Sequence, residues 1–248
     1  SSASTRQVSM LIHDPCSEYA NPFFPNTASP ALPAAARPAT PRDGWTRGEL
    51  RLLRRLSSPS RIQDWLDRLA YRPEDRPGCP RRVMEERRAN CYDGALFGAA
   101  ALRQLGHPPL LLDLRAVRDD DHVLAVFRRH GRFGAVAKSN FSGLRFREPV
   151  HRTLRELVLS YFEDYFNDAG EKTLRAWSGL LDLRRFDRLR WMFDDAPLQL
   201  ISDRLDALRH HPILTPAMAR ALSPVDARSK RAGMLGVLRA GLYRAGRR

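Results

Sequence analysis

One stretch of the chain constrains the fold more than any other, because it combines a helix pattern with unusually small side chains. Asn90 followed by Asp93 matches a capping box, and Gly106 with Pro108 marks the opposite end. The pattern predicts a helix from Cys91 to Leu105. Small side chains allow a helix to lie close to a sheet on one side and to other helices on the other. We therefore expect a central helix, whose small residues are Gly94, Ala95, Gly98, Ala99, Ala100 and Ala101.

Strand patterns follow this helix directly. Pro109 to Leu114 is a continuous apolar run, and His122 to Arg128 alternates between two faces. His130-Gly131 is typical of a hairpin turn, after which Phe133 to Lys138 would be the returning strand. One helix followed by hairpin-connected strands is an α+β order. We predict an α+β fold in which the cysteine-bearing helix packs on an antiparallel sheet, with extra helices at both ends.

The remaining segments divide the chain into three parts. Residues 1–43 are rich in proline and alanine, which predicts a tail or linker. Residues 44–210 are expected to form the domain, with its core in 90–178, and residues 211–248 a basic C-terminal helix or tail. Within the domain we expect helices after Thr46, Ser60 and Thr153, a strand and turn in Thr173–Leu183, and a helix over Leu198–Leu208. The aromatic residues in the helix after Thr153 are interpreted as core: Tyr161, Phe162, Tyr165 and Phe166.

The formal charge of +14 invites a nucleic-acid or anionic-membrane partner. We favour a solvated basic surface instead, because 39 of the 42 basic residues are arginine and they are spread along the chain. No apolar run approaches the roughly 20 residues of a membrane-spanning helix, and no charged-then-apolar leader opens the sequence. We therefore expect a globular protein of the cytoplasm.

The three cysteines, Cys16, Cys79 and Cys91, cannot all pair, and no C-x-x-C motif suggests a structural zinc site. Cys91 alone has a distinctive setting, because it directly follows the inferred helix cap. Backbone N–H groups and the helix dipole favour a thiolate in a first helical turn. A metal site formed by Cys91, His122 and Asp119–Asp121 is a weaker alternative. No cofactor is expected.

His122 begins the histidine strand, where it would lie beside the start of the helix. An imidazole near the sulfur can hold the thiolate as an ion pair and later return the proton to a leaving group. A third group should orient the ring. Asn140 is the first choice, since its amide oxygen can accept from a ring N–H, and strict strand alternation makes Ser139 a substitute. Asp121 and Asp113 are weaker candidates.

The run from Asn90 to Asn140 resembles the transglutaminase-like superfamily, whose members have a papain-like fold. The resemblance lies in the cysteine helix (CYDGALFGAAALRQLGHPP), the next strand (LLLDL) and the histidine hairpin (DHVLAVFRRHGRFGAVAKSN). It implies Cys91 as nucleophile and His122 as base. The family commonly carries a tryptophan and, four residues later, the third catalytic aspartate. Phe133 and Ala137 stand at those positions here.

These patterns indicate two functions. The first is thiol-dependent acyl transfer or hydrolysis, as in a cysteine protease or an acyltransferase, on a peptide, a protein or a small amide. The second is a catalytically inactive scaffold that binds a peptide or protein partner, which the departure at Phe133 and Ala137 favours. A basic adaptor for nucleic acid or membrane is the third and least favoured.

Overall fold

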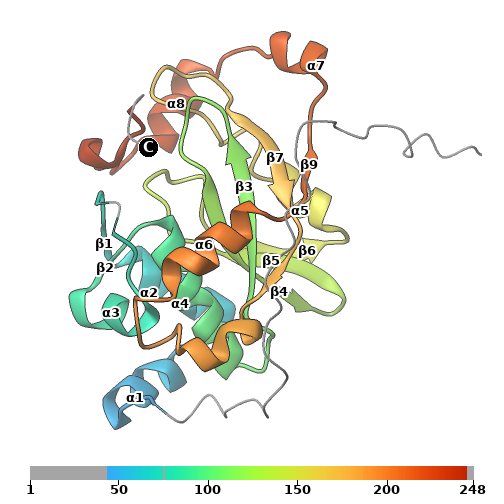
Figure 1. The fold of residues 1–248 in the computed structure, drawn as a ribbon. Helices are drawn as coiled ribbons and strands as arrows, with labels where there is room; N and C mark the ends of the chain where they lie inside the picture. The colour runs from blue at the N-terminus through green and yellow to red at the C-terminus, as the bar shows by residue number, and fades with distance from the viewer. Residues whose placement is uncertain (1–43, 75, 245–248) are drawn as a thin grey trace, which may run out of the picture. The chain divides into compact units, whose positions relative to one another are not determined.

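A computed structural model describes residues 44–74 and 76–244, and the expected tail over residues 1–43 lies outside them. The described chain is α+β, as predicted, and is built on one seven-stranded antiparallel sheet (Figure 1). The strand order is β6-β5-β4-β3-β7-β9, with β8 also paired to β3. These strands are β3 (Leu110–Ala116), β4 (His122–Arg129), β5 (Arg132–Val136), β6 (Arg147–His151), β7 (Leu174–Ser178), β8 (Leu181–Asp182) and β9 (His210–Pro212).

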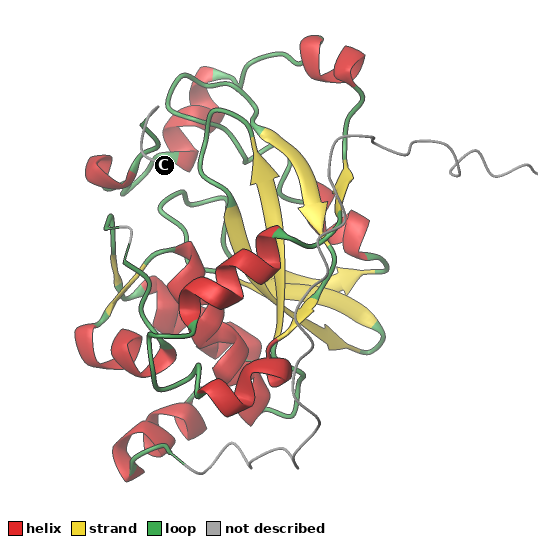
Figure 2. Ribbon diagram, in the orientation of Figure 1, coloured by secondary structure: helices red, strands yellow, loops and turns green. Residues whose placement is uncertain are grey.

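Most of the helices pack on one face of this sheet (Figure 2). The sheet contributes Leu111, Val123 and Ala125 to the hydrophobic core on that side. Successive strand residues point to opposite faces, so this core takes the odd-numbered residues of β3 and β4. The helices that share it are α1 (Arg47–Arg55), α2 (Pro59–Asp67), α3 (Pro80–Glu86), α4 (Cys91–Gln104), α6 (Leu198–Asp206) and the 3-10 helix η1 (Leu183–Leu189).

The predicted central helix is confirmed in α4, with Asn90 as N-cap and Asp93 completing the capping box. Its small residues allow the close approach that we expected. A Cβ at Gly98 would lie 3.0 Å from the Cβ of Ala125 in β4, and one at Gly94 would overlap the Cβ of Lys138. Overlap of this kind costs more than an ordinary contact, because close-packed neighbours have little room to move. Glycine at these two positions therefore sets how near α4 lies to the sheet.

A second, smaller core covers the opposite face of the sheet. It combines the even-numbered Leu112, Leu124 and Val126 with residues of α5 (Leu154–Leu159) and of the segment after it. The expected helix after Thr153 has the predicted N-cap, but it ends at Leu159. Of the aromatic residues beyond it, Tyr161 and Phe162 lie in a turn, and Phe166 forms an isolated β-bridge with Lys172. Their interpretation as core is confirmed for three of them, Tyr161, Tyr165 and Phe166, which are at most 2% exposed.

The C-terminal part departs from the expected boundaries. The division expected after residue 210 falls inside β9, which pairs with β7, so the sheet continues past it. The basic helix or tail expected over 211–248 is instead three short helices joined by loops, as far as residue 244: α7 (Pro216–Arg220), α8 (Ala227–Gly233) and the 3-10 helix η2 (Arg239–Gly241). The loop expected over residues 71–80 is bordered by a small parallel pair, β1 (Ala70–Tyr71) and β2 (Arg88–Ala89), that the sequence did not reveal.

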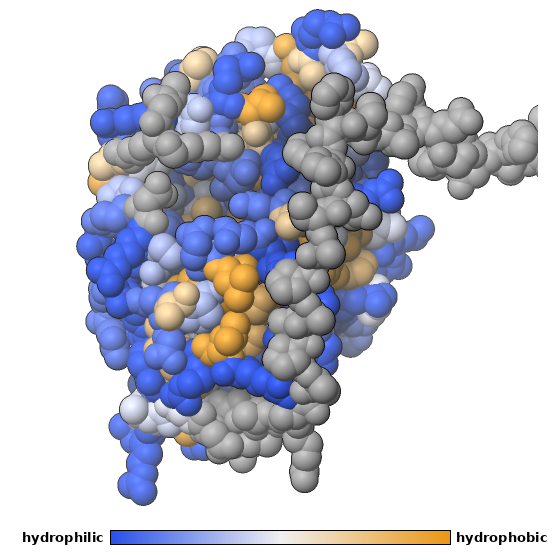
Figure 3. Space-filling view, viewed as in Figure 1, coloured by the Kyte–Doolittle hydropathy of each residue, from blue (hydrophilic) through white to orange (hydrophobic). Residues whose placement is uncertain are grey.

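The surface agrees with the abundance of arginine in the sequence. Figure 3 shows a face that is mostly hydrophilic, with an apolar area at the level of α6. Several arginines are ion-paired within the chain, as in the two-pronged contact of Arg103 with Asp187 at 2.6 and 2.7 Å. None of the described helices is both long enough and apolar enough to cross a membrane.

Candidate functional site

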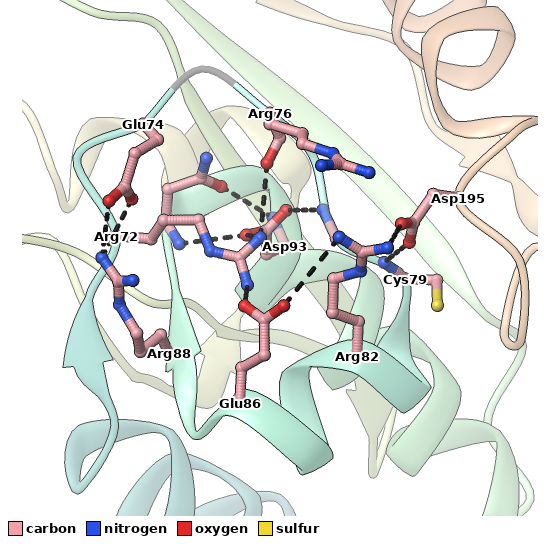
Figure 4. Close-up of polar contacts among 11 residues, drawn as sticks. Arg72, Glu74, Arg76, Cys79, Arg82, Glu86, Arg88, Asp93 and Asp195 are labelled. Carbon is pink, nitrogen blue, oxygen red and sulfur yellow. Dashed lines mark hydrogen bonds and ion pairs between the residues drawn. The ribbon is translucent and has the colours of Figure 1, made fainter.

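The first turn of α4 is held by a polar network whose centre, Asp93 and Arg72, is buried (Figure 4). Asn90 Oδ1 accepts the backbone N–H of Asp93 at 2.9 Å, which is the capping contact. The Asp93 carboxylate, fully buried, accepts the Gly78 N–H at 2.7 Å and pairs with the guanidinium of Arg72 at 3.2 Å. Arg72 also pairs with Glu86 of α3 at 2.6 Å. The network ties Arg72 and Gly78 to the turn that carries Cys91.

Burial gives Asp93 an unusual titration. Desolvation raises its pKa to about 6, although the Gly78 N–H and the Arg72 charge favour the ionised form and offset part of that rise. The Asp93 carboxyl therefore titrates close to neutral pH, and it holds the start of the helix. A negative charge here lies in the same turn as the thiol, so it opposes the stabilisation that the helix dipole offers a thiolate.

The Cys91 thiol lies against the beginning of β4. Its sulfur donates to the backbone carbonyl oxygen of Asp121 at 3.7 Å. Burial raises the pKa of the thiol to about 12; the Val123 N–H partly opposes that rise, and the charge of Asp120 adds to it. Cys91 is therefore a neutral thiol in this structure. The expectation that its place in the first turn would give a ready thiolate fails, because desolvation and the nearby carboxylates outweigh the helix dipole.

His122 is buried at 4% exposure, on the face of the sheet that carries α5. Its Nε2 lies 2.8 Å from the carbonyl oxygen of Leu144, and its ring packs edge-on against Tyr165. A carbonyl oxygen can only accept, so Nε2 carries the proton. Burial lowers the pKa of His122 to about 4, the Leu144 contact offsets part of that shift, and Arg147 adds to it. The ring is therefore neutral near pH 7, with Nδ1 as its acceptor.

Cys91 and His122 line one small pocket of about 40 Å³ at the end of the sheet. Tyr71, Asp120 and Asn140 contribute to its wall, as do Gly241 and Tyr243 from the far end of the described chain. The structure brings the two predicted residues together in this sense. In the part of the chain that it describes, however, the thiol and the imidazole are not hydrogen-bonded to each other. Each is bonded to a backbone carbonyl.

The residues considered for the third position have other partners. The Asn140 amide is bonded to the backbone of Leu238, and Ser139 Oγ accepts the Phe141 N–H at 3.0 Å. Asp121 Oδ1 accepts the Ala116 N–H at 2.8 Å, and Asp113 is bonded to His210 at 2.9 Å. The contact expected from Asn140 to the ring is made instead by the Leu144 carbonyl. Asn140 lies beyond the end of β5 at Val136, where strand alternation no longer fixes its direction.

Two features of the pocket could not be predicted from the sequence. The Leu144 carbonyl carries no side-chain signal, because any residue at that position would offer the same oxygen. The chain around Gly241 lies about 150 residues from Cys91 in sequence, so no local pattern joins them. Among the described residues no three His, Cys, Asp or Glu side chains converge in a way that would hold a metal ion.

Comparison with models of known protein families and with curated proteins finds no match to this sequence. The transglutaminase-like resemblance therefore rests on the residues quoted for it, and the function has to be argued from the pocket.

Proposed function

We propose that the protein carries out thiol-dependent acyl transfer or hydrolysis at Cys91, with His122 as base, on a transglutaminase-like variant of the papain-like fold. One observation carries the proposal: the thiol at the head of α4 and the imidazole at the head of β4 line the same pocket. An amide or ester of a peptide, protein or small molecule would be the acyl donor.

The protonation states favour a neutral dyad over a preformed ion pair. Because Nε2 donates to the Leu144 carbonyl, Nδ1 of His122 is the atom able to take a proton from the thiol. The thiol would exchange its Asp121 partner for Nδ1 as sulfur attacks the carbonyl carbon of the donor. The Leu144 carbonyl would then act as the orienting group, the role a carboxylate or amide side chain plays in other cysteine sites.

The reaction then proceeds in two steps, acylation of Cys91 and deacylation of the resulting thioester. The C–S bond forms while the thiol proton passes to Nδ1, and the resulting oxyanion is stabilised by backbone N–H groups near Cys91. Collapse breaks the bond to the leaving amine or alcohol, which takes the proton back from His122 and leaves a thioester. Water or a second amine attacks the thioester, gives its proton to His122, and releases Cys91 as the proton returns to sulfur.

Alkylation of Cys91 by iodoacetamide tests this proposal. Cys79 and Cys16, which lies outside the described residues, are replaced by serine so that one thiol remains. We expect the alkylation rate at pH 7 to fall at least tenfold in His122→Ala, since general-base assistance contributes about 10²–10⁴-fold. His130→Asn is the matched control, because His130 is an exposed histidine at a turn with positive φ that asparagine tolerates. Equal rates in the parent and in His122→Ala would refute the proposal.

A catalytically inactive peptide-binding scaffold is the second candidate. It is favoured by the contacts of the two side chains, since thiol and imidazole each bond a backbone carbonyl and not one another. On this alternative Cys91 would react no faster than an ordinary partly buried thiol, with or without His122, while the pocket would still bind a peptide.

A further inference from the structure

The pocket at Cys91 is partly walled by a segment of the same chain, Leu238–Tyr243. Asn140 holds this segment by both atoms of its amide: Oδ1 accepts the Leu238 N–H at 2.8 Å, and Nδ2 donates to the Leu238 carbonyl at 3.0 Å. Just upstream, Ser142 donates from its backbone N–H to Gly233 at 3.0 Å and from its hydroxyl to Ala232 at 2.8 Å. The chain is therefore anchored at Ala232–Gly233 and again at Leu238, the first residue of the segment.

Asn140 contacts the backbone of Leu238 and makes no hydrogen bond that depends on the residue type at that position. The Leu238 side chain is 42% exposed, and its φ of −77° and ψ of 111° are those of extended chain. Any extended peptide presents an N–H and a carbonyl on one residue in this way, and peptide-binding sites use such main-chain bonds for affinity. Asn140 would accept almost any residue at that position.

Selectivity lies at Gly241, three residues further on. A Cβ there would lie 2.6 Å from Cε1 of Tyr71 and 3.1 Å from Nδ2 of Asn140. Gly241 does not have a positive φ, so glycine is required for space and not for backbone conformation. Tyr71 lines the same pocket, so a side chain at position 241 would have to displace the Tyr71 ring. The site therefore excludes side chains at this one position.

Charge supplies a third criterion. The acidic wall residues of the pocket are Asp119, Asp120 and Asp121, whereas the segment carries the exposed Arg239 and is followed directly by the exposed Arg244. Opposite charges on a site and its occupant raise specificity and the rate of association.

We propose that this pocket is the open part of a peptide-binding site for a basic segment that is extended at the residue held by Asn140 and turns to a glycine three residues later, and that Leu238–Tyr243 occupies the rest of that site as a built-in pseudosubstrate. The inference rests on the proposed function in that it identifies the peptide presented to Cys91. Asn140 is then a substrate-positioning residue, and the segment must leave before a peptide in solution can enter.

Binding of a fluorescein-labelled peptide with the sequence of residues 236–244 tests the inference by fluorescence anisotropy. The full-length chain carries Cys91→Ser, so that no turnover occurs. Gly241→Ala and Leu238→Pro each release the bound segment, the first by overlap with Tyr71 and the second by removing the N–H at a φ that proline tolerates. Release removes an internal competitor, so both variants should bind the peptide at least about tenfold more tightly than the parent.

Three further binding measurements test which contacts hold the peptide. Gly48→Ala should bind the peptide as the parent does, because the nearest atoms to a Cβ at Gly48 are 3.9 Å away. Adding Asn140→Ala to Gly241→Ala should abolish the gain in affinity. A peptide with alanine in place of the glycine that corresponds to Gly241 should bind at least about tenfold more weakly.

The inference is overturned if hydrogen exchange shows the segment released in Gly241→Ala and the peptide still does not bind. Binding that ignores both Asn140→Ala and the glycine-to-alanine peptide would overturn it as well. The experiments distinguish failure of the thiol chemistry from failure of the peptide site. Peptide binding with an inert Cys91 would refute the thiol chemistry and leave the peptide site, whereas a Cys91 dependent on His122 without peptide binding would do the reverse.

Discussion

The imidazole of His122 donates its Nε2 proton to the backbone carbonyl of Leu144 across 2.8 Å. This bond fixes the ring orientation and the tautomer without any acidic or amide side chain. Leu144 and Tyr165 belong to the core on the α5 face, and the Tyr165 ring packs edge-on against the buried imidazole. The ring therefore stays uncharged, and its remaining nitrogen is available as an acceptor.

We expect His122 to remain a neutral Nε2–H tautomer from pH 5 to pH 8. Its pKa is lowered to about 4, mainly because burial penalises the charged imidazolium. Two-bond ¹H–¹⁵N spectra of histidine-labelled protein report the tautomer and any titration, with the exposed His130 as an internal reference. A His122 resonance that titrates between pH 6 and pH 7 would contradict the buried geometry.

The central helix and the hairpin could be predicted because their signals are local. Asn90 and Asp93 lie one turn apart, so they make the capping box whatever the rest of the chain does. His130 and Gly131 both have positive φ, at 49° and 75°, which is the conformation that a two-residue hairpin turn requires.

The site could be predicted only in part, because its contacts are not local. Strand alternation places His122 with Leu124, but it does not say which face α4 will cover. The orienting group is a carbonyl, which no residue type reveals. The thiolate was expected from the helix dipole alone, whereas burial and the charge of Asp120, both set by tertiary packing, decide the pKa of Cys91.

Gly94→Ala should destabilise the fold by about 1–3 kcal/mol, because the added Cβ overlaps that of Lys138. Lys138 cannot move away easily, since its Nζ donates to the carbonyls of Leu66 and Leu69 at 3.0 and 2.6 Å. Urea denaturation gives the free energy of unfolding. Gly48→Ala in α1 is the control and should gain up to about 1 kcal/mol, because in this helix its Cβ would make only ordinary contacts at 3.9 Å. A similar gain in both variants would show that α4 lies farther from Lys138.

Asn90→Ala should lower the free energy of unfolding by about 1–2 kcal/mol, because the Asp93 N–H loses its capping acceptor. Asn90→Ser should retain most of the stability, since a serine hydroxyl caps nearly as well. Equilibrium denaturation of the three proteins at pH 7 distinguishes these outcomes. If Asn90→Ala and Asn90→Ser lower the free energy of unfolding by the same amount, the cap contributes nothing and another contact of Asn90 is responsible for the loss.

Asp119→Asn should change how stability depends on pH. Asp119 is 8% exposed, its Oδ2 accepts the Thr173 hydroxyl at 2.7 Å, and burial raises its pKa from 3.8 to about 6. Between those values the folded protein keeps a proton that the unfolded chain has lost, so raising the pH through this window favours unfolding. The parent should therefore lose stability relative to Asp119→Asn, by up to about 3 kcal/mol at roughly 1.4 kcal/mol per pKa unit. Urea midpoints for both proteins at pH 4, 5, 6 and 7 measure the difference. A constant difference across this range would mean that Asp119 titrates as it does in the unfolded chain, and a difference of the opposite sign would place its carboxylate in a stabilising ion pair.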